Sequence, residues 1–151
     1  MSQDKELPWV ETVDTSYLES LLGYNARRAF LVAGAKFSER MARFDLKPAD
    51  FSVLSLVLHN PGITSRQLCA TLAIQPPNLV GLVGALERRG LVERHPHPRD
   101  GRAMGLHLTT AGEKLVADAE RTVAELEAEA ASALSPSELR TLLKLLQKVY
   151  R

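Results

Sequence analysis

Two short helical patterns joined by a three-residue turn constrain the fold of this chain more than any other feature. Thr64 and Gln67 have the T-x-x-Q spacing of a capping box, which predicts a helix that starts here and runs to Leu72. Residues 73–75 leave room only for a tight turn before a Pro-Pro pair that suits the first turn of a second helix, which closes with two arginines and Gly90. The sequence therefore predicts a helix-turn-helix.

Directly after Gly90 the apolar pattern changes from helical to alternating. Residues 91–94 have the composition of a strand, and residues 103–108 place apolar side chains at every second position, which predicts a second strand. Between them, Asp100 and Gly101 form a turn signal, and the neighbouring prolines suit the edge or tip of a hairpin. A helix-turn-helix followed by a basic hairpin is a winged helix.

Long amphipathic patterns flank the winged helix on both sides. The S-x-x-E match at Ser16 predicts a capping box and a helix that continues for about seven turns at 3.6 residues per turn. Capping-box matches at Thr110 and Ser135 predict two further helices. Because these helices offer more apolar surface than one small winged helix covers, we expect an obligate, two-fold dimer.

These patterns predict a mainly α fold with a small β-hairpin wing (α+β), a winged helix-turn-helix flanked by long dimerisation helices. Residues 1–45 form an N-terminal arm and dimerisation helix, residues 46–108 the winged helix-turn-helix lobe, and residues 109–151 the C-terminal dimerisation helices of one intertwined domain. The net charge of +1 divides along the same boundaries into −1, +3 and −1. Six of the seven basic residues in the central segment are arginine, whose planar fork suits phosphates and narrow minor grooves.

Other parts of the sequence exclude several classes of protein. The first nine residues carry both charge signs and no apolar segment, so we predict no signal peptide. The longest uncharged stretch, residues 67–86, is interrupted by two prolines and polar residues, so we predict no membrane span. Cys69 is the only cysteine, which excludes an internal disulfide and fits a cytoplasmic protein; we favour a buried structural thiol over an oxidant sensor.

The distribution of aromatic residues indicates which nucleic acid the basic centre would bind. Residues 52–149 contain no Phe, Tyr or Trp. Proteins that bind single strands need exposed rings on which bases stack, so this centre favours double-stranded DNA.

Three segments now identify a family. They are Leu86-Glu87-Arg88-Arg89-Gly90-Leu91-Val92-Glu93-Arg94, Pro98-Arg99-Asp100-Gly101-Arg102, and Leu108-Thr109-Thr110-Ala111-Gly112. In order and spacing they resemble the L-E-x-x-G-L-V-x-R, D-x-R wing and L-T-x-x-G segments of the multiple-antibiotic-resistance regulator (MarR) family of winged-helix transcription factors. The resemblance implies a homodimer that binds a palindromic operator, usually represses, and often releases DNA when a small aromatic or anionic molecule or an oxidant engages it.

The resemblance also implies roles for the wing residues. Arg102 matches the wing arginine that enters the minor groove, Asp100 would orient its guanidinium, and Arg99 would lie close to phosphates. The alternative is a solvated turn whose charges have no partner.

Residues 75–89 are the candidate recognition helix, but its outward face carries few side chains that read bases. The candidate DNA-binding residues outside the wing are Thr64, Arg66, Gln75, Asn78, Val80 and Arg88. Gly81 and Gly84 add no side chain to this face, and each weakens a helix by about 1 kcal/mol relative to Ala. Either these glycines allow the backbone to approach DNA closely, or base reading is sparse and the site is chosen partly by DNA shape.

In the family, the effector pocket lies between the dimerisation helices and the winged helix. The resemblance therefore makes five residues candidates for lining it: Trp9, Tyr24, Arg27, Arg28 and His59. Each is also explained as a core aromatic or a surface polar side chain.

No motif indicates catalysis or a cofactor. The chain has no phosphate loop, nucleophile elbow or paired catalytic carboxylates, so we predict that it is not an enzyme. The predicted hairpin would allow His95, His97 and His107 to approach one another, but without a Cys or a matching carboxylate cluster we predict no metal site. The alternative to a DNA-binding regulator is a winged-helix dimer that has lost specific DNA binding and serves as a protein-interaction or ligand-binding module.

Overall fold

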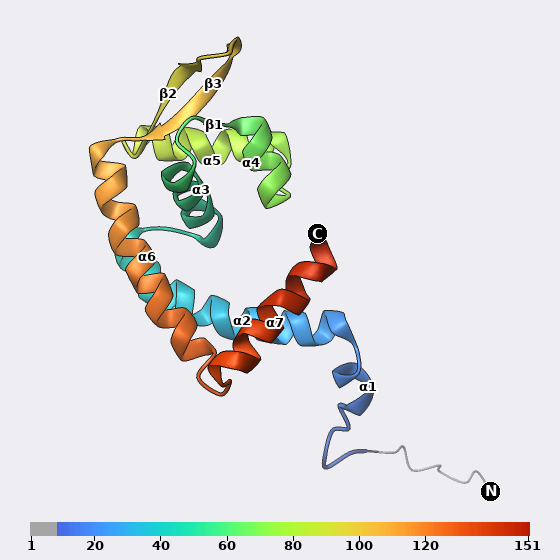
Figure 1. Ribbon diagram of the computed structural model, residues 1–151. Helices are drawn as coiled ribbons and strands as arrows, with labels where there is room; N and C mark the ends of the chain where they lie inside the picture. Colours follow the sequence, from blue (N-terminus) through green and yellow to red (C-terminus); the bar gives the residue numbers. More distant parts are fainter. Residues whose placement is uncertain (1–8) are drawn as a thin grey trace, which may run out of the picture. The chain divides into compact units, whose positions relative to one another are not determined.

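The computed structural model describes residues 9–151 (Figure 1). They form two compact units, residues 9–32 and Ala33–Arg151. Residues 1–8 lie outside the described residues. They contain the start of the predicted N-terminal arm and eight of the nine residues for which we predict no signal peptide.

The first helix differs from the prediction. α1 (Ser16–Glu19) has Thr15 at its N-cap, so Ser16 is the first helical residue and does not form a capping box. α2 (Leu22–Met41) begins after a break. Asn25 Nδ2 donates to the carbonyl oxygens of Glu19 (2.8 Å) and Leu21 (2.7 Å), and such side-chain bonds compete with helical backbone bonds. The prediction of one unbroken helix from Ser16 is therefore wrong.

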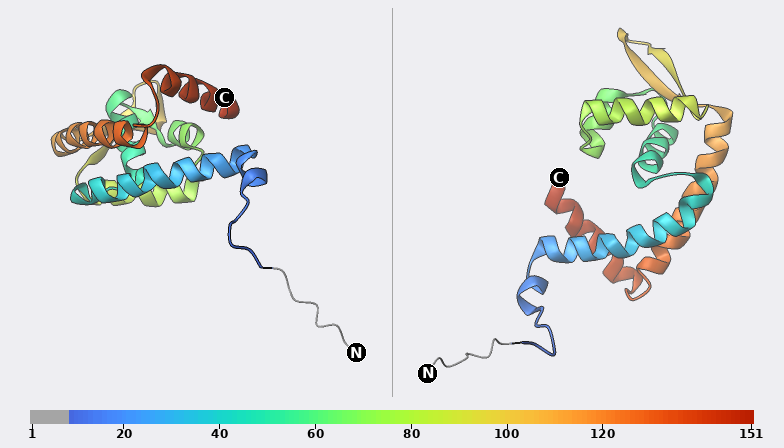
Figure 2. Two further views of the ribbon diagram at one scale, coloured as in Figure 1. Left: turned by 90° about the horizontal axis from the view of Figure 1, so that it is seen from below. Right: turned by 180° about the vertical axis from the view of Figure 1, so that it is seen from behind.

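The second unit contains the winged helix and the helices that follow it. Its elements after α2 are η1 (Ala42–Phe44), α3 (Pro48–His59), β1 (Ile63–Thr64), α4 (Ser65–Leu72), α5 (Pro76–Arg88), β2 (Val92–His97), β3 (Asp100–Leu108), α6 (Thr110–Ala130) and α7 (Pro136–Tyr150). The strands form one antiparallel sheet in the order β1-β3-β2. The β2–β3 hairpin extends beyond α4 and α5 in Figure 1 and in the right-hand view of Figure 2. A mainly α winged-helix fold is confirmed.

The helix-turn-helix forms as predicted. Thr64 Oγ1 accepts from the backbone N–H of Gln67 (3.3 Å), and Gln67 Oε1 accepts from that of Thr64 (2.9 Å), which completes the capping box of α4. Ala73 takes the left-handed conformation that ends the helix, with φ of 52°. α5 then buries an apolar stripe against the core, consisting of Leu79, Val83 and Leu86.

The tip of the hairpin does not lie where the turn signal predicted. Asp100 and Gly101 belong to β3, and the turn is formed by Pro98 and Arg99. His97 pairs with Asp100, with a register irregularity between Pro96 and His97, so strand pairing continues outward until only two residues remain for the loop. Proline, with its fixed φ and no N–H, suits the first turn position. The Asp-Gly prediction is therefore wrong.

The start of α6 is one residue earlier than the predicted capping box. Thr109, not Thr110, is the N-cap: its Oγ1 accepts from the backbone N–H of Gly112 (3.0 Å) and donates to the carbonyl of Gly90 (2.6 Å). The cap thus joins α6 to the turn after α5. At α7 the prediction is confirmed, because Ser135 and Glu138 cap each other reciprocally.

The core and the exposed apolar faces lie on different elements. Buried side chains from α3, α4, α5 and the sheet form one cluster with Val116, Ala119 and Leu126 of α6. In contrast, α7 contains no buried residue, and its large apolar side chains are exposed: Leu142, Leu143, Leu145, Val149 and Tyr150. These faces fit the predicted dimer. Among residues 9–151 no single helix is long and apolar enough to span a membrane, and α4 with α5 reaches that composition only as a pair bent by 116°.

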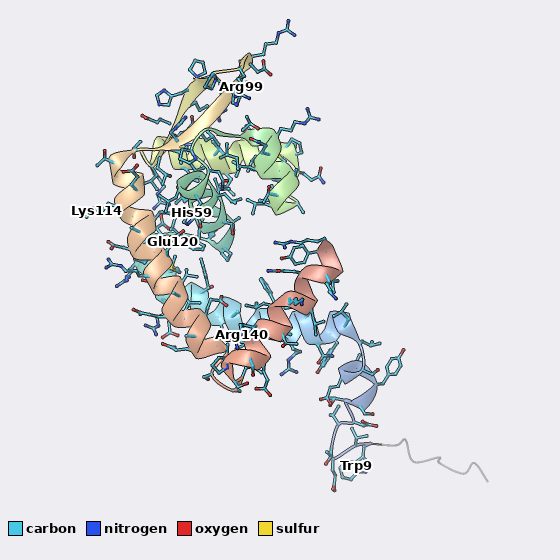
Figure 3. The ribbon with its side chains drawn as sticks, in the orientation of Figure 1. Trp9, His59, Arg99, Lys114, Glu120 and Arg140 are labelled. Carbon is cyan, nitrogen blue, oxygen red and sulfur yellow. The ribbon has the colours of Figure 1, made fainter. Side chains whose placement is uncertain are left out.

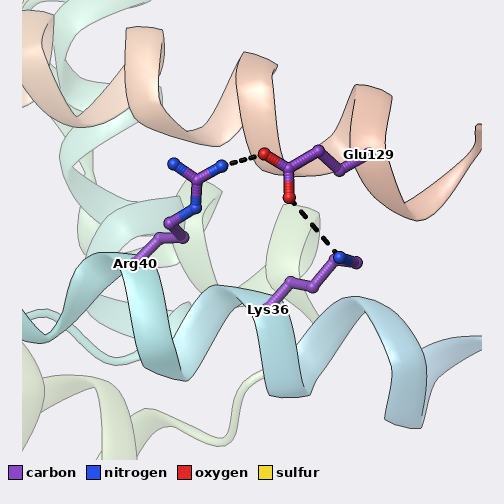
Figure 4. A network of polar contacts seen from close by, with 3 residues as sticks. All are labelled: Lys36, Arg40 and Glu129. Carbon is purple, nitrogen blue, oxygen red and sulfur yellow. Dashed lines mark hydrogen bonds and ion pairs between the residues drawn. The ribbon is translucent and has the colours of Figure 1, made fainter.

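A polar network joins α2 to α6 (Figure 4). Lys36 Nζ lies 3.4 Å from Glu129 Oε2, and Arg40 pairs with the other carboxylate oxygen of Glu129. In η1, Arg43 Nη2 donates to the hydroxyl of the buried Thr122 of α6 (2.7 Å). Three basic residues of α2 and η1 therefore bind polar side chains of α6.

Candidate nucleic-acid interface

A groove of about 500 Å³ lies between the start of α4 and the wing. Its lining residues are Thr64, Ser65, Arg66, Gln67, Arg94, His97, Asp100, Ala103 and Met104. Three residues predicted to contact DNA, Thr64, Arg66 and Asp100, are thus brought together by elements distant in sequence. Arg94 and His97 border the same groove but were not predicted as site residues, although Arg94 is the last residue of a segment that carries the family resemblance.

Arg99 lies at the outer end of the wing (Figure 3), and Asp100 follows it as the first residue of β3. The Oδ1 atom of Asp100 accepts from the backbone N–H of Arg102 (3.1 Å), and His97 Nδ1 accepts from that of Arg99 (3.3 Å). Among residues 9–151 no ion pair joins Asp100 to the Arg102 guanidinium. Asp100 therefore shapes the backbone of the tip, which is a different contact from the predicted one with the guanidinium.

The outward face of α5 is exposed and nearly smooth. Gln75, Asn78 and Val80 are exposed, and Val80 keeps 63% of its surface accessible. Gly81 has no heavy atom within 4 Å of the position that a Cβ would take. No packing constraint of the described residues therefore requires a glycine there.

The arginines of the central segment fall into two groups. Arg89 donates to the carbonyls of Asp45 (2.7 Å) and Phe44 (2.8 Å), and Arg94 is paired with Glu87. The other four form no ion pair within residues 9–151: Arg66, Arg88, Arg99 and Arg102. Their charge is not compensated by the described residues, and all four are exposed side chains available to an anion.

The effector candidates are divided between the two units. In the first, Trp9 is 78% exposed, Arg27 is exposed, and Arg28 Nη1 donates to the Tyr24 hydroxyl (3.1 Å). In the second, His59 on α3 has its Nε2 2.9 Å from Oε1 of Glu120 on α6 (Figure 3). Within the first unit, Tyr24 and Arg28 are in contact.

The histidines of the wing contact each other, but not as a metal site. The rings of His95 and His107 lie edge to face with centroids 5.0 Å apart, and His95 Nε2 lies 2.8 Å from Glu93 Oε1. Within residues 9–151 no group of three or more His, Cys, Asp or Glu side chains is placed to hold a metal ion. Cys69 is half-buried and packs against the core.

Comparison with known proteins gives a consistent set of relatives. Residues 44–103 match the sequence model of the MarR family. Over 131 residues (86% of this chain and 79% of the relative), the chain is 29% identical to a Thauera aromatica protein proposed to regulate transcription of the hcr operon.

Solved structures extend the likeness to nearly the whole chain. The transcriptional repressor CouR bound to a 23-mer DNA duplex is 36% identical, with a TM-score of 0.86 over 93% of this chain and 100% of that one. CouR bound to p-coumaroyl-CoA is 35% identical, with a TM-score of 0.81 over 93% of this chain and 99% of that one.

Proposed function

Because this chain belongs to the MarR family of winged-helix transcription regulators, we propose that it is a homodimeric, ligand-responsive repressor that binds a palindromic DNA operator. The observation that carries this proposal is the set of four exposed arginines that form no ion pair within residues 9–151, of which Arg66 lines the α4–wing groove, on a fold that in CouR accompanies a bound duplex. We place the DNA-binding lobe at residues 46–108 and the dimerisation helices on either side. The protein acts in the cytoplasm, by binding and not by catalysis.

Each part of the interface has its own task in this proposal. Arg102 enters the minor groove from the wing, while Asp100 holds the backbone of the tip and Arg99 lies beside phosphates. On α5, the exposed Gln75, Asn78 and Val80 contact base edges. Phosphate contacts outside the wing come from the last of these candidates: Thr64, Arg66 and Arg88.

The effector belongs to the class of aromatic anions. Support comes from CouR, whose structure with p-coumaroyl-CoA has the same fold as this chain. Tyr24 and Arg28, which are in contact, offer a ring and a guanidinium to such a molecule, with Trp9, Arg27 and His59 as further candidates. p-Coumarate and p-coumaroyl-CoA are therefore the first probes to add to the protein, with a shift in melting temperature as the measurement and Arg28→Ala as the variant.

The first prediction concerns Arg102. Arg102→Ala should weaken operator binding roughly tenfold or more, because a charged contact in the groove is lost, while the dimer stays folded. Binding is measured by gel shift on an operator obtained by footprinting the wild-type protein, over a series of salt concentrations. The wild-type affinity should fall steeply with salt, since each phosphate contact releases counterions.

Arg121→Ala is the matched control, because Arg121 is also exposed but lies on α6 and pairs with Asp118. Unchanged affinity of Arg102→Ala would remove Arg102 from the interface. Equal binding of the wild-type protein to operator and unrelated duplex would instead favour the second candidate, a winged-helix module for protein or ligand binding. The smooth face of α5 is the observation that keeps this candidate in consideration.

A further inference from the structure

A two-point ion pair joins α5, the candidate recognition helix, to β2 of the wing. Arg94 Nε donates to Glu87 Oε1 (2.8 Å), and Arg94 Nη2 donates to Glu87 Oε2 (3.1 Å). Glu87 lies in the last turn of α5, and Arg94 lies in β2, so the pair bridges the turn around Gly90. A planar guanidinium and a carboxylate joined at two points restrict orientation as well as distance.

Because Arg94 lies at the base of the hairpin, this contact can set the orientation of the whole wing. Arg94 is the Cα partner of Leu106, which is fully buried and also pairs with Ile63 of β1, so Arg94 stands at the root of the hairpin. The tip at Arg99 lies five residues further on, or about 16 Å at 3.3 Å per strand residue. A small rotation at the root therefore moves the tip by a larger distance.

We propose that Glu87 and Arg94 are positioning residues that set the angle between α5 and the wing, so that both meet one operator half-site together. The proposal rests on the DNA-binding function proposed above. Both side chains are about one-third exposed, 31% for Glu87 and 35% for Arg94, and this exposure to water limits what even a two-point pair contributes to folding stability. Loss of the pair should therefore change the orientation of the wing without unfolding the lobe.

The variant Glu87→Gln separates positioning from simple charge. If Arg94 only attracted phosphates and Glu87 weakened that attraction, removing the negative charge would strengthen binding to every duplex. If the pair positions the wing, affinity for the operator should instead fall roughly fivefold, a loss of the size measured when the interaction between two contacting residues is removed. Affinity for a scrambled duplex should not fall. Arg94→Lys, which keeps the charge but loses the two-point contact, should behave in the same way.

Glu93→Gln is the matched control for these variants. It removes an equal charge from β2, next to Arg94 in the sequence, but Glu93 contacts His95 and not Arg94. Its operator affinity should not fall. Stronger binding of Glu87→Gln to both duplexes, or an equal loss in Glu93→Gln, would overturn the proposal.

A second measurement does not depend on DNA. Spin labels are placed at Val80→Cys on α5 and Arg99→Cys in the tip, with Cys69→Ala, and labelled chains are diluted into unlabelled ones so that each dimer carries one labelled subunit. In labelled chains that keep the Glu87–Arg94 pair, including the Glu93→Gln control, the distance between the two labels should be narrowly distributed. In labelled chains that also carry Glu87→Gln or Arg94→Lys, the distribution should be broader. Equal widths would overturn the positioning role even if DNA binding were found, whereas a wild-type protein without operator preference would overturn only the proposed function.

Discussion

At the scale of single residues, equal charges have unequal tasks. Arg89 and Arg102 count alike in the net charge, yet Arg89 is held by the carbonyls of Phe44 and Asp45, while Arg102 forms no ion pair within residues 9–151. The sequence alone does not show which of the two arginines is already bound within the protein. The partners of Arg89 are backbone carbonyls about 45 residues earlier in the chain, which no local pattern contains. Charge counting therefore locates a basic lobe but overstates the number of arginines that are free to bind DNA.

The second prediction concerns Gly112. A Cβ on Gly112 would lie 2.1 Å from the carbonyl oxygen of Leu91, which is backbone and does not rotate away. Gly112→Ala should therefore lower the free energy of unfolding by about 2–3 kcal/mol, as other overpacked sites do. Urea denaturation measures the loss, and a change below about 0.5 kcal/mol, the usual range for surface substitutions, would contradict the close contact.

The third prediction concerns the pH dependence at Glu138. The hydrogen bond from the backbone N–H of Ser135 holds the pKa of Glu138 below its ordinary value of 4.5. Ionised Glu138 is thus favoured in the folded state, so its stabilising effect is complete above that ordinary value and is lost as the pH falls through the lowered pKa. The melting temperatures of wild type and Glu138→Gln should differ most near neutral pH and converge on acidification. A constant difference would contradict this account.

At the scale of elements, local rules succeed where both partners of a cap are present. Thr64 with Gln67 and Ser135 with Glu138 are such pairs, and both helices start where the sequence predicts. The rules fail where adjacent residues compete: Thr109 caps α6 in place of Thr110 because it also reaches the carbonyl of Gly90. That carbonyl is 19 residues away, so no local pattern contains it.

The predictions for the wing and for the first helix are wrong for related reasons. The Asp100-Gly101 signal is overruled by strand pairing that continues to His97 and Asp100. The break before α2 depends on Asn25 reaching back six residues to Glu19, which helical periodicity does not detect. The groove between α4 and the wing is likewise a product of tertiary packing, and only three of its nine lining residues, Thr64, Arg66 and Asp100, were predicted from the sequence.

The fourth prediction concerns Gly81 and the face of α5. Because a Cβ there meets no atom within 4 Å, Gly81→Ala should stabilise the protein by about 1 kcal/mol through helix propensity. If Gly81 allows the backbone to approach DNA closely, the added methyl should weaken operator binding despite this gain. Denaturation and gel shift on the same preparation measure both effects. Unchanged affinity would favour sparse base reading and selection by DNA shape.

At the scale of the whole molecule, the apolar surface of α7 indicates where the second subunit binds. Leu142, Leu143 and Val149 are between 42% and 62% exposed, and α7 has no buried residue of its own. An amphipathic helix is stable in water mainly when its apolar face is covered. We therefore expect dimerisation to be part of folding in this chain.

The fifth prediction follows from that coupling. The melting temperature should rise with protein concentration, because association stabilises the folded state by mass action. Leu143→Glu should abolish this dependence and yield a monomer or an unfolded chain, because Leu143 is an exposed apolar side chain of α7. Calorimetry over a wide range of concentrations, with sedimentation on the same samples, measures both. A concentration-independent transition of a folded dimer would contradict the coupling.

The separation of the α7 stripe from the wing has a genetic consequence. A chain that carries Arg102→Ala keeps its whole C-terminal helix and can still pair with a normal chain. Mixed dimers then present one competent and one incompetent wing to a two-part operator. A cell that makes both chains in equal amount would assemble about one fully competent dimer in four if pairing is random, as expected for a symmetric interface. Loss-of-function alleles in the wing should therefore be dominant, and those in α7 recessive.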